Sequence, residues 1–335
     1  MTSVLCPVCA ADSCSPIETV GNYHLHRCPF CELQFWDPMQ NPGRQWYEEA
    51  PRGVLRDKIF SRPGLHWRHH QFLRKPFPQG SRILDIGCGV GTFAAHCERK
   101  GYQTIGIDFD RNAIAAAREV CGLRQVYALT LEEFIQRPEA DGFDVVAVFE
   151  VLEHQDDPAR FISRIKRLLK PAGCIALSVP NRDRWHLLPV EDVPPNHLTR
   201  WNVAALGRFL DSQGFEIIEI SENPLSLQQA LSVVSGKLND WVPSLGHIKR
   251  NVLSRSAKFV ACTDESRART AARGYRLLVW LWTAALFAPS AFLVPYARLS
   301  GKKGECIYCL ARLRNGNGSG RSRVVTGEVC EQSHC

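Results

Sequence analysis

The feature that most constrains this chain is a glycine-rich turn between a short apolar strand and a helix. Residues 82–93 read RILDIGCGVGTF, with glycines at positions 87, 89 and 91. Glycine adopts positive φ angles without steric cost and lets the backbone approach a ligand closely. A turn of this kind joins a strand of a parallel sheet to the helix that follows it.

The segments around this turn alternate between strand and helix patterns. Such alternation predicts right-handed βαβ units and therefore an α/β fold with a doubly wound sheet. Helices are expected at 93–101, 110–122, 156–173 and 202–214, with Asp110 capping the second, Asp156 or Asp157 capping the third and Pro171 stopping it. Strands are expected at 81–87, 102–108, 123–129, 143–149, 174–180, 215–221 and 305–313.

Two acidic residues narrow the choice of ligand. The glycine turn alone fits NAD, FAD or S-adenosylmethionine. Asp85 stands inside the strand before the glycines, where a carboxylate repels a pyrophosphate but suits the cationic amino-acid end of S-adenosylmethionine. Asp108 ends the next strand, about 20 residues on, where a carboxylate meets ribose hydroxyls in βαβ nucleoside sites. The two acids therefore favour S-adenosylmethionine.

Several motifs in one order carry a family resemblance: ILDIGCGVGTF, GIDFD, FDVVAVFEVLEH, LKPAGCIALSVPN and NHLTRWNVAALGRFLDSQGF. Residues 63–221 and the final strand resemble class I S-adenosylmethionine-dependent methyltransferases, within the branch that includes the ubiquinone-biosynthesis O-methyltransferases. The resemblance implies a mostly parallel seven-stranded sheet with an antiparallel last strand beside the sixth. It also implies methyl transfer to a small-molecule or lipid-linked acceptor, at oxygen.

The resemblance also implies residue roles at the cofactor. Thr130 replaces an acidic residue that the family often has near the adenine, so adenine recognition is expected from backbone groups near Leu131. The cofactor-binding residues expected in this chain are Asp85, Gly87, Cys88, Gly89, Gly91, Asp108, Phe109, Leu131, Phe149 and Glu150.

Two histidines are candidates for the chemistry. An oxygen acceptor needs a base to take its proton, and His154 and His197 lie on loops after the fourth and fifth strands, at the edge of the sheet where ligands bind. The resemblance adds a divalent-metal site at Glu150, Glu153 and His154; the alternative is that Glu153 and His154 only cap a helix and bond a neighbouring loop. Trp185 and Trp201 either line an acceptor pocket or pack in the core.

The N-terminal segment carries two C-x₂-C pairs, Cys6 with Cys9 and Cys28 with Cys31. Four thiolates at this spacing suit a tetrahedral structural zinc. Cys14, His24 and His26 stand nearby as alternative ligands. The N-terminus shows neither a basic region nor an apolar region typical of a secretory signal, so a cytoplasmic location and reduced thiols are expected for the 14 cysteines. The pair at 306 and 309 falls in a predicted strand and is interpreted as sheet.

Changes in composition divide the chain into six parts. The expected parts are a zinc ribbon (1–36), a linker with a short helix (37–80), the methyltransferase core (81–221), a basic and apolar helical insertion (222–303), the last core strand (304–314) and a disordered tail (315–335).

Residues 277–297 hold no charge, and basic residues flank them on both sides. If both ends of the insertion join one sheet, a single membrane span is excluded. We therefore expect a monotopic helical hairpin at the cytoplasmic face of a membrane, with a buried core hairpin as the alternative. The net charge of +7 fits an anionic membrane surface or nucleic acid.

Three functions remain to be weighed. The leading one is a small-molecule or lipid methyltransferase. The alternative is a zinc-ribbon rRNA or tRNA methyltransferase. RNA binding needs a basic surface, and Arg27 is the only Lys or Arg in residues 1–36, so the ribbon disfavours this alternative. A non-catalytic regulator that binds S-adenosylmethionine is the third. The sequence does not indicate the acceptor or the oligomeric state.

Overall fold

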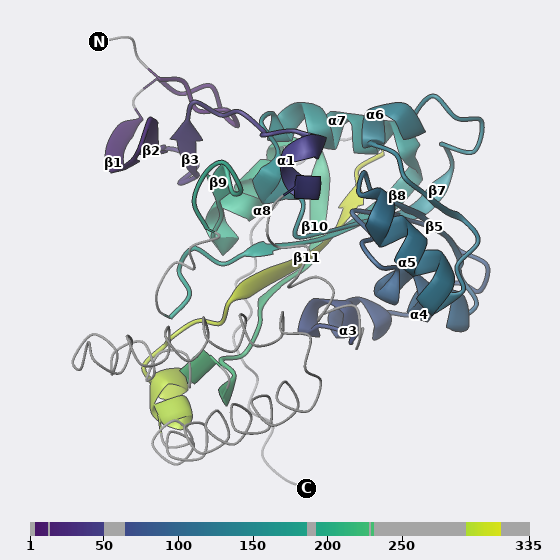
Figure 1. Ribbon diagram of the computed structural model, residues 1–335. Helices are drawn as coiled ribbons and strands as arrows, with labels where there is room; N and C mark the ends of the chain where they lie inside the picture. Colours follow the sequence, from purple (N-terminus) through teal and green to yellow (C-terminus); the bar gives the residue numbers. More distant parts are fainter. Residues whose placement is uncertain are drawn as a thin grey trace, which may run out of the picture.

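A computed structural model describes residues 4–12, 14–49, 64–185, 192–227, 229–230 and 293–315. Its centre is a seven-stranded sheet with strand order β10-β11-β8-β7-β4-β5-β6 (Figure 1). Strand β11 is antiparallel to both of its neighbours, and the other neighbouring pairs are parallel. The predicted fold class is therefore confirmed. The strands are β4 Arg82–Ile86, β5 Gln103–Ile107, β6 Val126–Tyr127, β7 Phe143–Phe149, β8 Leu169–Pro180, β10 Phe215–Glu222 and β11 Cys306–Leu313.

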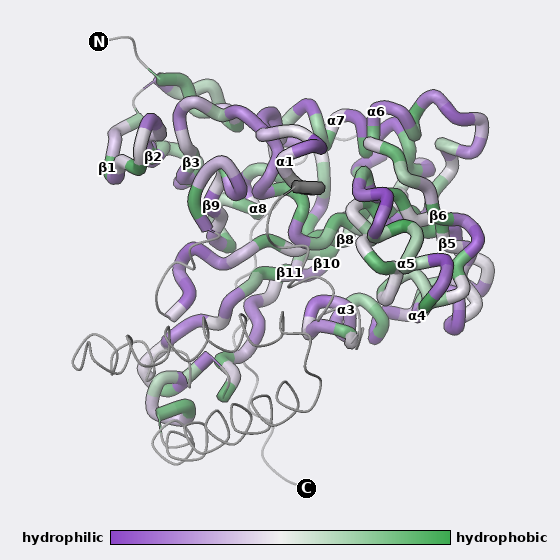
Figure 2. Tube along the Cα trace, viewed as in Figure 1, coloured by the Kyte–Doolittle hydropathy of each residue, from purple (hydrophilic) through white to green (hydrophobic). Residues whose placement is uncertain are grey.

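Helices cover both faces of this sheet. Because strand side chains alternate between faces, Leu84 and Ile86 pack with α6, α7 and α8, whereas Ile83 packs with α3 and α4. Figure 2 shows hydrophobic residues along the central strands and polar residues on the outer turns of the helices. The helices are α3 Trp67–Leu73, α4 Thr92–Arg99, α5 Arg111–Cys121, α6 Leu131–Phe134, α7 Pro158–Leu168 and α8 Val203–Ser212.

Helix ends follow the local sequence, with one difference. Asp110 accepts hydrogen bonds from the first turn of α5, and Gly122 ends that helix with φ +70°, both as predicted. Asp157 caps α7. This helix ends at Leu168, three residues before Pro171, and the following residues already belong to β8. The residue before a proline disfavours helical geometry, and extended backbone lets the Lys170 ammonium pair with Asp144.

A second sheet lies beside the first. It has the order β1-β2-β3-β9, and all of its pairings are antiparallel. Three strands come from the N-terminal segment, β1 Ser15–Val20, β2 Tyr23–Arg27 and β3 Gln34–Asp37, and α1 Arg44–Glu49 follows them. The fourth, β9 Thr199–Arg200, comes from the methyltransferase core after β8.

Most of the predicted insertion lies outside the described residues, including 277–292 of the uncharged stretch, as does most of the predicted tail. The end of the insertion is described: residues 293–299 are helical, Val294 and Ala297 pack against Leu225 and Ala230, and Arg298 donates to the Leu225 carbonyl. Within the part of the chain that the structure describes, no helix is long and apolar enough to cross a membrane.

Candidate active site

The three glycines of the turn after β4 have different surroundings. All three have positive φ, at +73° for Gly87, +53° for Gly89 and +75° for Gly91. A Cβ at Gly87 would lie 2.5 Å from Val151 Cγ2, and one at Gly91 would lie 2.3 Å from Leu123 Cδ1. A Cβ at Gly89 would meet no atom within 4 Å. Gly87 and Gly91 therefore let other segments pack closely, whereas Gly89 faces the open side of the turn.

Cys88 points away from that open side. Its side chain is buried in the cluster between α4 and α5. Its Sγ lies 2.9 Å from where a Cβ at Gly106 would stand, so a glycine at this point of β5 makes room for the thiol. Both Gly87 and Cys88 donate backbone hydrogen bonds to the Ile107 carbonyl, which fixes the turn on the end of β5.

Asp85 is a buried carboxylate without a compensating donor. It is 3% exposed, and its Oδ2 has no hydrogen-bond partner among the described residues. Burial, aided by the negative charge of Asp108, raises the pKa of Asp85 to about 8. A buried acceptor of this kind is costly unless a donor or cation meets it. The site therefore fits the ammonium group of a bound S-adenosylmethionine.

Asp108 ties the two strand ends together. Its Oδ2 accepts the Gly89 N–H at 3.0 Å and its Oδ1 accepts the Asp110 N–H at 2.9 Å. The half-buried Asp108 stands at the carboxyl end of β5, where a carboxylate meets ribose hydroxyls in βαβ nucleoside sites. Phe109, also half-buried, follows it at the edge of the sheet.

The end of β7 lies next to α3. Phe149 is buried, with its ring centroid 5.0 Å from that of Phe93 and 5.2 Å from that of His69. Glu150 follows at φ +56°, a sparsely populated conformation for a non-glycine residue. Its Oε1 accepts from the Ser178 hydroxyl at 2.8 Å and lies 3.9 Å from the Arg68 guanidinium. Sequence reasoning missed Arg68, because nothing in the helix pattern of 64–75 indicates that it reaches Glu150.

The loop after β6 carries Thr130 and Leu131, the residues for which a place near the adenine is expected. Thr130, which stands where the family often has an acid near the adenine, caps α6 by accepting the Glu133 N–H. The Leu131 side chain is buried in the main core. Any contact of Leu131 with the cofactor would therefore be made by its backbone.

On the acceptor side, the structure brings together Glu153, His154 and His197. One ligand atom from each lies within 4.8 Å of the others, and the two imidazole rings meet edge to face at a centroid distance of 4.8 Å. Glu153 and His154 belong to a short 3₁₀ helix after β7, Leu152–His154, whereas His197 comes from the loop before β9. We call these three residues the acceptor-side cluster. Both histidines predicted for the chemistry belong to it.

Each histidine is oriented through its Nδ1 atom. His154 Nδ1 is 2.6 Å from the Asn196 carbonyl oxygen, and His197 Nδ1 is 2.7 Å from Asp192 Oδ1. Burial alone would raise the pKa of Asp192, but the hydrogen bond from His197 and the charge of Arg184 outweigh it and lower this pKa. Asp192 is therefore ionised and accepts from the His197 ring. Sequence reasoning missed Asp192, since only the folded loop places it beside His197.

Glu153 is the most buried member of the cluster, at 1% exposure. Neither carboxylate oxygen has a hydrogen-bond partner among the described residues, and burial, aided by the charge of Glu150, raises its pKa well above the usual range. One carboxylate and two imidazoles form a donor set that suits a divalent cation, and ligating histidines usually bond a carboxylate or carbonyl through the other ring nitrogen. Glu150 is not part of this ligand group.

The two tryptophans considered for the acceptor pocket are packed elsewhere. Trp201 is fully buried against Phe209, and its Nε1–H donates to the Thr199 hydroxyl. Trp185 packs with the small cluster around Leu225 and Ala230.

The four N-terminal cysteines form one group. Their sulfur atoms all lie within 4.8 Å of one another, with 3.5 Å between Cys6 and Cys31 and 3.4 Å between Cys9 and Cys28. Four sulfurs around one zinc stand about 3.8 Å apart, so the group fits a tetrahedral metal. Cys14 is outside it and donates to the Ala11 carbonyl. The two knuckles share one conformation, with Ala10 and Glu32 at φ +57° and +66°.

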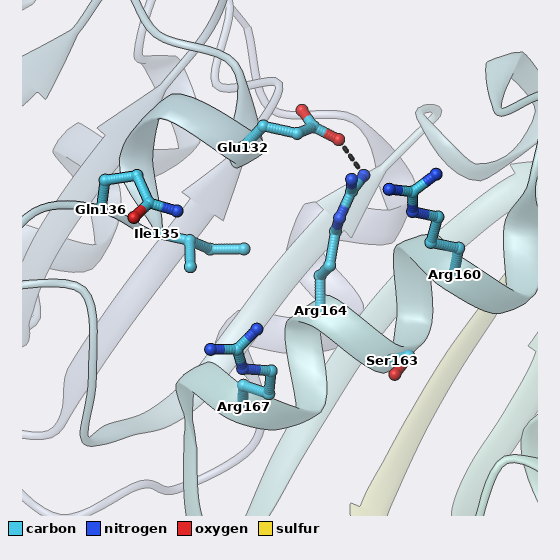
Figure 3. Close-up of a pocket in the computed structure, with 7 residues that line it drawn as sticks. All are labelled: Glu132, Ile135, Gln136, Arg160, Ser163, Arg164 and Arg167. Atoms are coloured by element: carbon cyan, nitrogen blue, oxygen red, sulfur yellow. Dashed lines mark hydrogen bonds and ion pairs between the residues drawn. The ribbon is translucent and has the colours of Figure 1, made fainter.

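Away from these sites, a surface cavity of about 360 Å³ lies between α6 and α7 (Figure 3). Arg164 reaches across it to pair with Glu132. No residue predicted for the cofactor or the chemistry lines it. The lining residues are Glu132, Ile135, Gln136, Arg160, Ser163, Arg164 and Arg167.

The sheet order and the sites at its carboxyl edge define the class I methyltransferase fold. Solved structures agree: phosphoethanolamine N-methyltransferase 2 of Haemonchus contortus, in complex with S-adenosylmethionine, matches over 90% of this chain and 71% of its own at a TM-score of 0.50 and 17% identity. This likeness concerns the fold.

Sequence comparisons give the family. Residues 40–220, more than half of the chain, match the Methyltransferase domain family. The ubiquinone biosynthesis O-methyltransferase of Nitrobacter winogradskyi is 30% identical over 203 residues, which are 57% of this chain and 72% of that protein. A second such enzyme, from Hahella chejuensis, is 36% identical over 31% of this chain and 45% of its own length. A probable S-adenosylmethionine-dependent methyltransferase of Mycolicibacterium smegmatis is 34% identical over 46% and 63%. The chain therefore belongs to the S-adenosylmethionine-dependent methyltransferases.

Proposed function

We propose that this enzyme transfers a methyl group to an oxygen of a small-molecule or lipid-linked acceptor, with His197 as the general base. The observation that carries this proposal is the hydrogen bond between Asp192 and His197 within the acceptor-side cluster. The relatives from Nitrobacter winogradskyi and Hahella chejuensis are named ubiquinone biosynthesis O-methyltransferases, which supports oxygen as the acceptor atom. The matches span between 45% and 72% of these two relatives, so the acceptor is proposed from the site and not transferred whole.

Bound S-adenosylmethionine would supply an activated methyl group, so the protein has to supply position and proton transfer. Asp85 would hold the ammonium group and Asp108 the ribose, while Gly89 leaves room for the ligand. The ionised Asp192 accepts the Nδ1–H of His197 and so leaves the Nε2 lone pair to take the proton of an acceptor hydroxyl. Both histidines lie on loops after the carboxyl ends of parallel strands, and Asp85, Gly89 and Asp108 lie at or just after the carboxyl ends of β4 and β5.

The acceptor-side cluster supports a divalent cation as an alternative to the His197 base, because the two Glu153 oxygens are buried without hydrogen-bond partners among the described residues. Glu153, His154 and His197 would then hold the ion, so His197 Nε2 would be a ligand and not the base, and the ion would lower the pKa of a coordinated hydroxyl. Equilibrium dialysis with Mn²⁺ tests this role without an activity assay. Binding that is lost in Glu153→Gln supports the cation, and equal binding by this variant and the natural protein excludes it.

At the four N-terminal thiols we propose a structural zinc, because four sulfur ligands leave no position open for catalysis. Elemental analysis of the purified protein tests it. One zinc per chain that is lost in a Cys6→Ser, Cys9→Ser double variant is the expected result, and an absence of zinc from the natural protein would contradict it. We also propose that the chain divides as its composition indicates, with this ribbon preceding the methyltransferase core.

The experiment that tests the function is transfer of a tritium-labelled methyl group from S-adenosylmethionine to separated lipid, RNA and glycan pools. Incorporation into the lipid pool as a base-stable methyl ether is the expected result. Incorporation into RNA alone would replace this proposal with the rRNA or tRNA methyltransferase alternative. Cofactor binding without incorporation into any pool would indicate a non-catalytic regulator.

Association with the cytoplasmic face of a membrane is part of the proposal, and it rests on the uncharged stretch at 277–297 with basic residues on both sides. Flotation with anionic liposomes, compared with a variant whose residues 225–302 are replaced by a short turn, tests it. Intact protein that stays soluble and monomeric without lipid or detergent would contradict it.

A further inference from the structure

The ribbon and the acceptor-side cluster share one strand. Strand β9 pairs with β3 of the ribbon, Gln34 opposite Arg200 and Phe35 opposite Thr199, and it forms part of the ribbon's sheet and not of the central one (Figure 1). His197 stands two residues before this strand. The segment that carries His197 therefore takes its position from the ribbon.

A backbone connection links the ribbon to the second part of the cluster. The Trp36 N–H, on β3, donates to the Leu198 carbonyl at 2.9 Å, and the Leu198 N–H donates to the Glu153 carbonyl at 2.8 Å. Leu198 is fully buried between them. One peptide segment thus holds the ribbon on one side and the loop of Glu153 and His154 on the other.

Side chains make a parallel connection through Arg200, which is 4% exposed. Its guanidinium donates to Glu18 Oε2 on β1 at 3.0 Å and lies 5.0 Å from the Trp36 ring centroid. The same group donates to the Asp192 carbonyl at 3.0 Å, and Asp192 in turn accepts from His197. Ribbon residues therefore fix Arg200, and Arg200 fixes the residue that orients the proposed base.

The ribbon needs its four thiols to hold this shape. A segment of about 36 residues is too small to form a stable core by burial alone, and metal binding commonly supplies the folding free energy of such units. Three of the thiols, on Cys6, Cys28 and Cys31, are buried beside Leu33 and Phe35. The cofactor residues Asp85, Gly89 and Asp108 belong to β4, β5 and the loops that follow them in the central sheet, whereas the ribbon strands form the other sheet.

We propose that the metal-loaded ribbon is the positioning device for the acceptor-side cluster: it holds residues 192–202 and through them His197 and the Glu153 loop, while cofactor binding is independent of it. This inference rests on the proposed function for its catalytic meaning. Its structural content, that the ribbon metal orders residues 192–202, stands separately.

The test compares Cys9→Ser, which removes one thiol of the group, with Cys14→Ser, which removes a nearby thiol outside it. Zinc content is measured by elemental analysis, amide exchange of 151–156 and 192–202 by mass spectrometry, cofactor binding by calorimetry and methyl incorporation into a total lipid extract by tritium counting. For Cys9→Ser we expect loss of zinc, at least tenfold faster exchange in both segments, at least tenfold less incorporation and S-adenosylmethionine affinity within twofold. Cys14→Ser should match the natural protein in all four.

A second pair of variants tests the same connection with all four thiols intact. Glu18→Gln weakens the ribbon's hold on Arg200, and Thr19→Ala removes an exposed side chain on the same strand. We expect faster exchange of 192–202 in Glu18→Gln at unchanged zinc content, and no change in Thr19→Ala. Unchanged protection of 192–202 in Cys9→Ser overturns the proposal, and so does loss of cofactor binding together with zinc. If the natural protein transfers no methyl group at all, the proposed function fails, but the exchange results still decide this inference.

Discussion

The proposed reaction site has a cofactor end and an acceptor end, and the two are built in different ways. At the cofactor end, Asp85, Gly89 and Asp108 belong to two adjacent strands, β4 and β5, and their loops, within residues 85–108. At the acceptor end, the His197 loop takes its position from the Glu153 loop and from ribbon residues such as Glu18 and Trp36.

The two ends therefore depend on different kinds of contact, local at the cofactor end and long-range at the acceptor end. The cofactor end is fixed by one βαβ unit, so its geometry follows from neighbouring residues. The acceptor end depends on contacts between segments more than 100 residues apart in the chain, such as that between Trp36 and Leu198. Substitutions should therefore divide into those that abolish cofactor binding and those that abolish transfer at intact cofactor binding.

The largest effect is expected from Gly87→Val. The new side chain would overlap Val151 and would hold a β-branched residue at φ +73°. Left-handed strain and overpacking together should cost roughly 3–5 kcal/mol of unfolding free energy. We expect no measurable S-adenosylmethionine binding by calorimetry and a lower midpoint in urea. Natural affinity in this variant would contradict the assignment of the turn.

His197→Ala should reduce methyl transfer without changing cofactor binding. Removal of a general base typically lowers the rate about 10²–10⁴-fold, and the contacts of His197 with Asp192 and His154 lie on loops other than those of β4 and β5. Tritium transfer should fall by this amount while cofactor affinity stays within twofold. Asp192→Asn should cause a smaller loss of transfer, because the imidazole remains but loses its anionic partner. Full activity of His197→Ala would remove it from the chemistry.

Cofactor binding should depend on pH through Asp85. In the folded chain Asp85 keeps its proton up to about pH 8, whereas in the unfolded chain it loses it near pH 4. Between these values the folded state holds the extra proton, so this group makes the unfolding free energy of the ligand-free protein fall as pH rises. A bound ammonium favours the ionised carboxylate, and binding therefore releases the proton.

Affinity for S-adenosylmethionine should consequently rise by up to about tenfold per pH unit below pH 8. Calorimetry between pH 6 and 8, in two buffers of different ionisation enthalpy, measures both the affinity and the released proton. Asp85→Asn is the control, with weaker binding and no proton release. An equally steep profile in this variant would assign the dependence to another group.

The smallest expected effect on cofactor binding comes from alanine at Gly89, and alanine at Gly122, which also has positive φ, is its control. Gly89 and Gly122 both have positive φ and open space where a Cβ would stand. Alanine should cost each about 1–2 kcal/mol of stability. Only Gly89→Ala places a methyl group on the open side of the cofactor turn, and we expect it to weaken S-adenosylmethionine binding about tenfold. Equal affinity in the Gly89→Ala and Gly122→Ala variants would show that Gly89 does not face the ligand.

Local pattern was sufficient for much of this molecule. The strand–turn–helix at 82–99, the Asp110 cap and the glycine that ends α5 could all be predicted. These features depend on residues a few positions apart, where steric limits, hydrogen bonds and hydrophobic periodicity act directly. The grouping of the four thiols could also be predicted, because each C-x₂-C knuckle carries the spacing of two metal ligands.

Other features were decided by the tertiary structure alone. From the sequence, Gly87, Gly89 and Gly91 were equivalent. In the structure Val151 packs against Gly87 and Leu123 against Gly91, and Gly89 alone of the three has open space where a Cβ would stand. It named His154 and His197 separately, and only the fold brings them within 4.8 Å and adds Asp192 and Arg200 behind them. Such contacts join segments whose separation along the chain carries no periodic signal. They form because β9 pairs with β3 of the ribbon and not with the central sheet, and packing and hydrogen bonding in three dimensions determine this pairing.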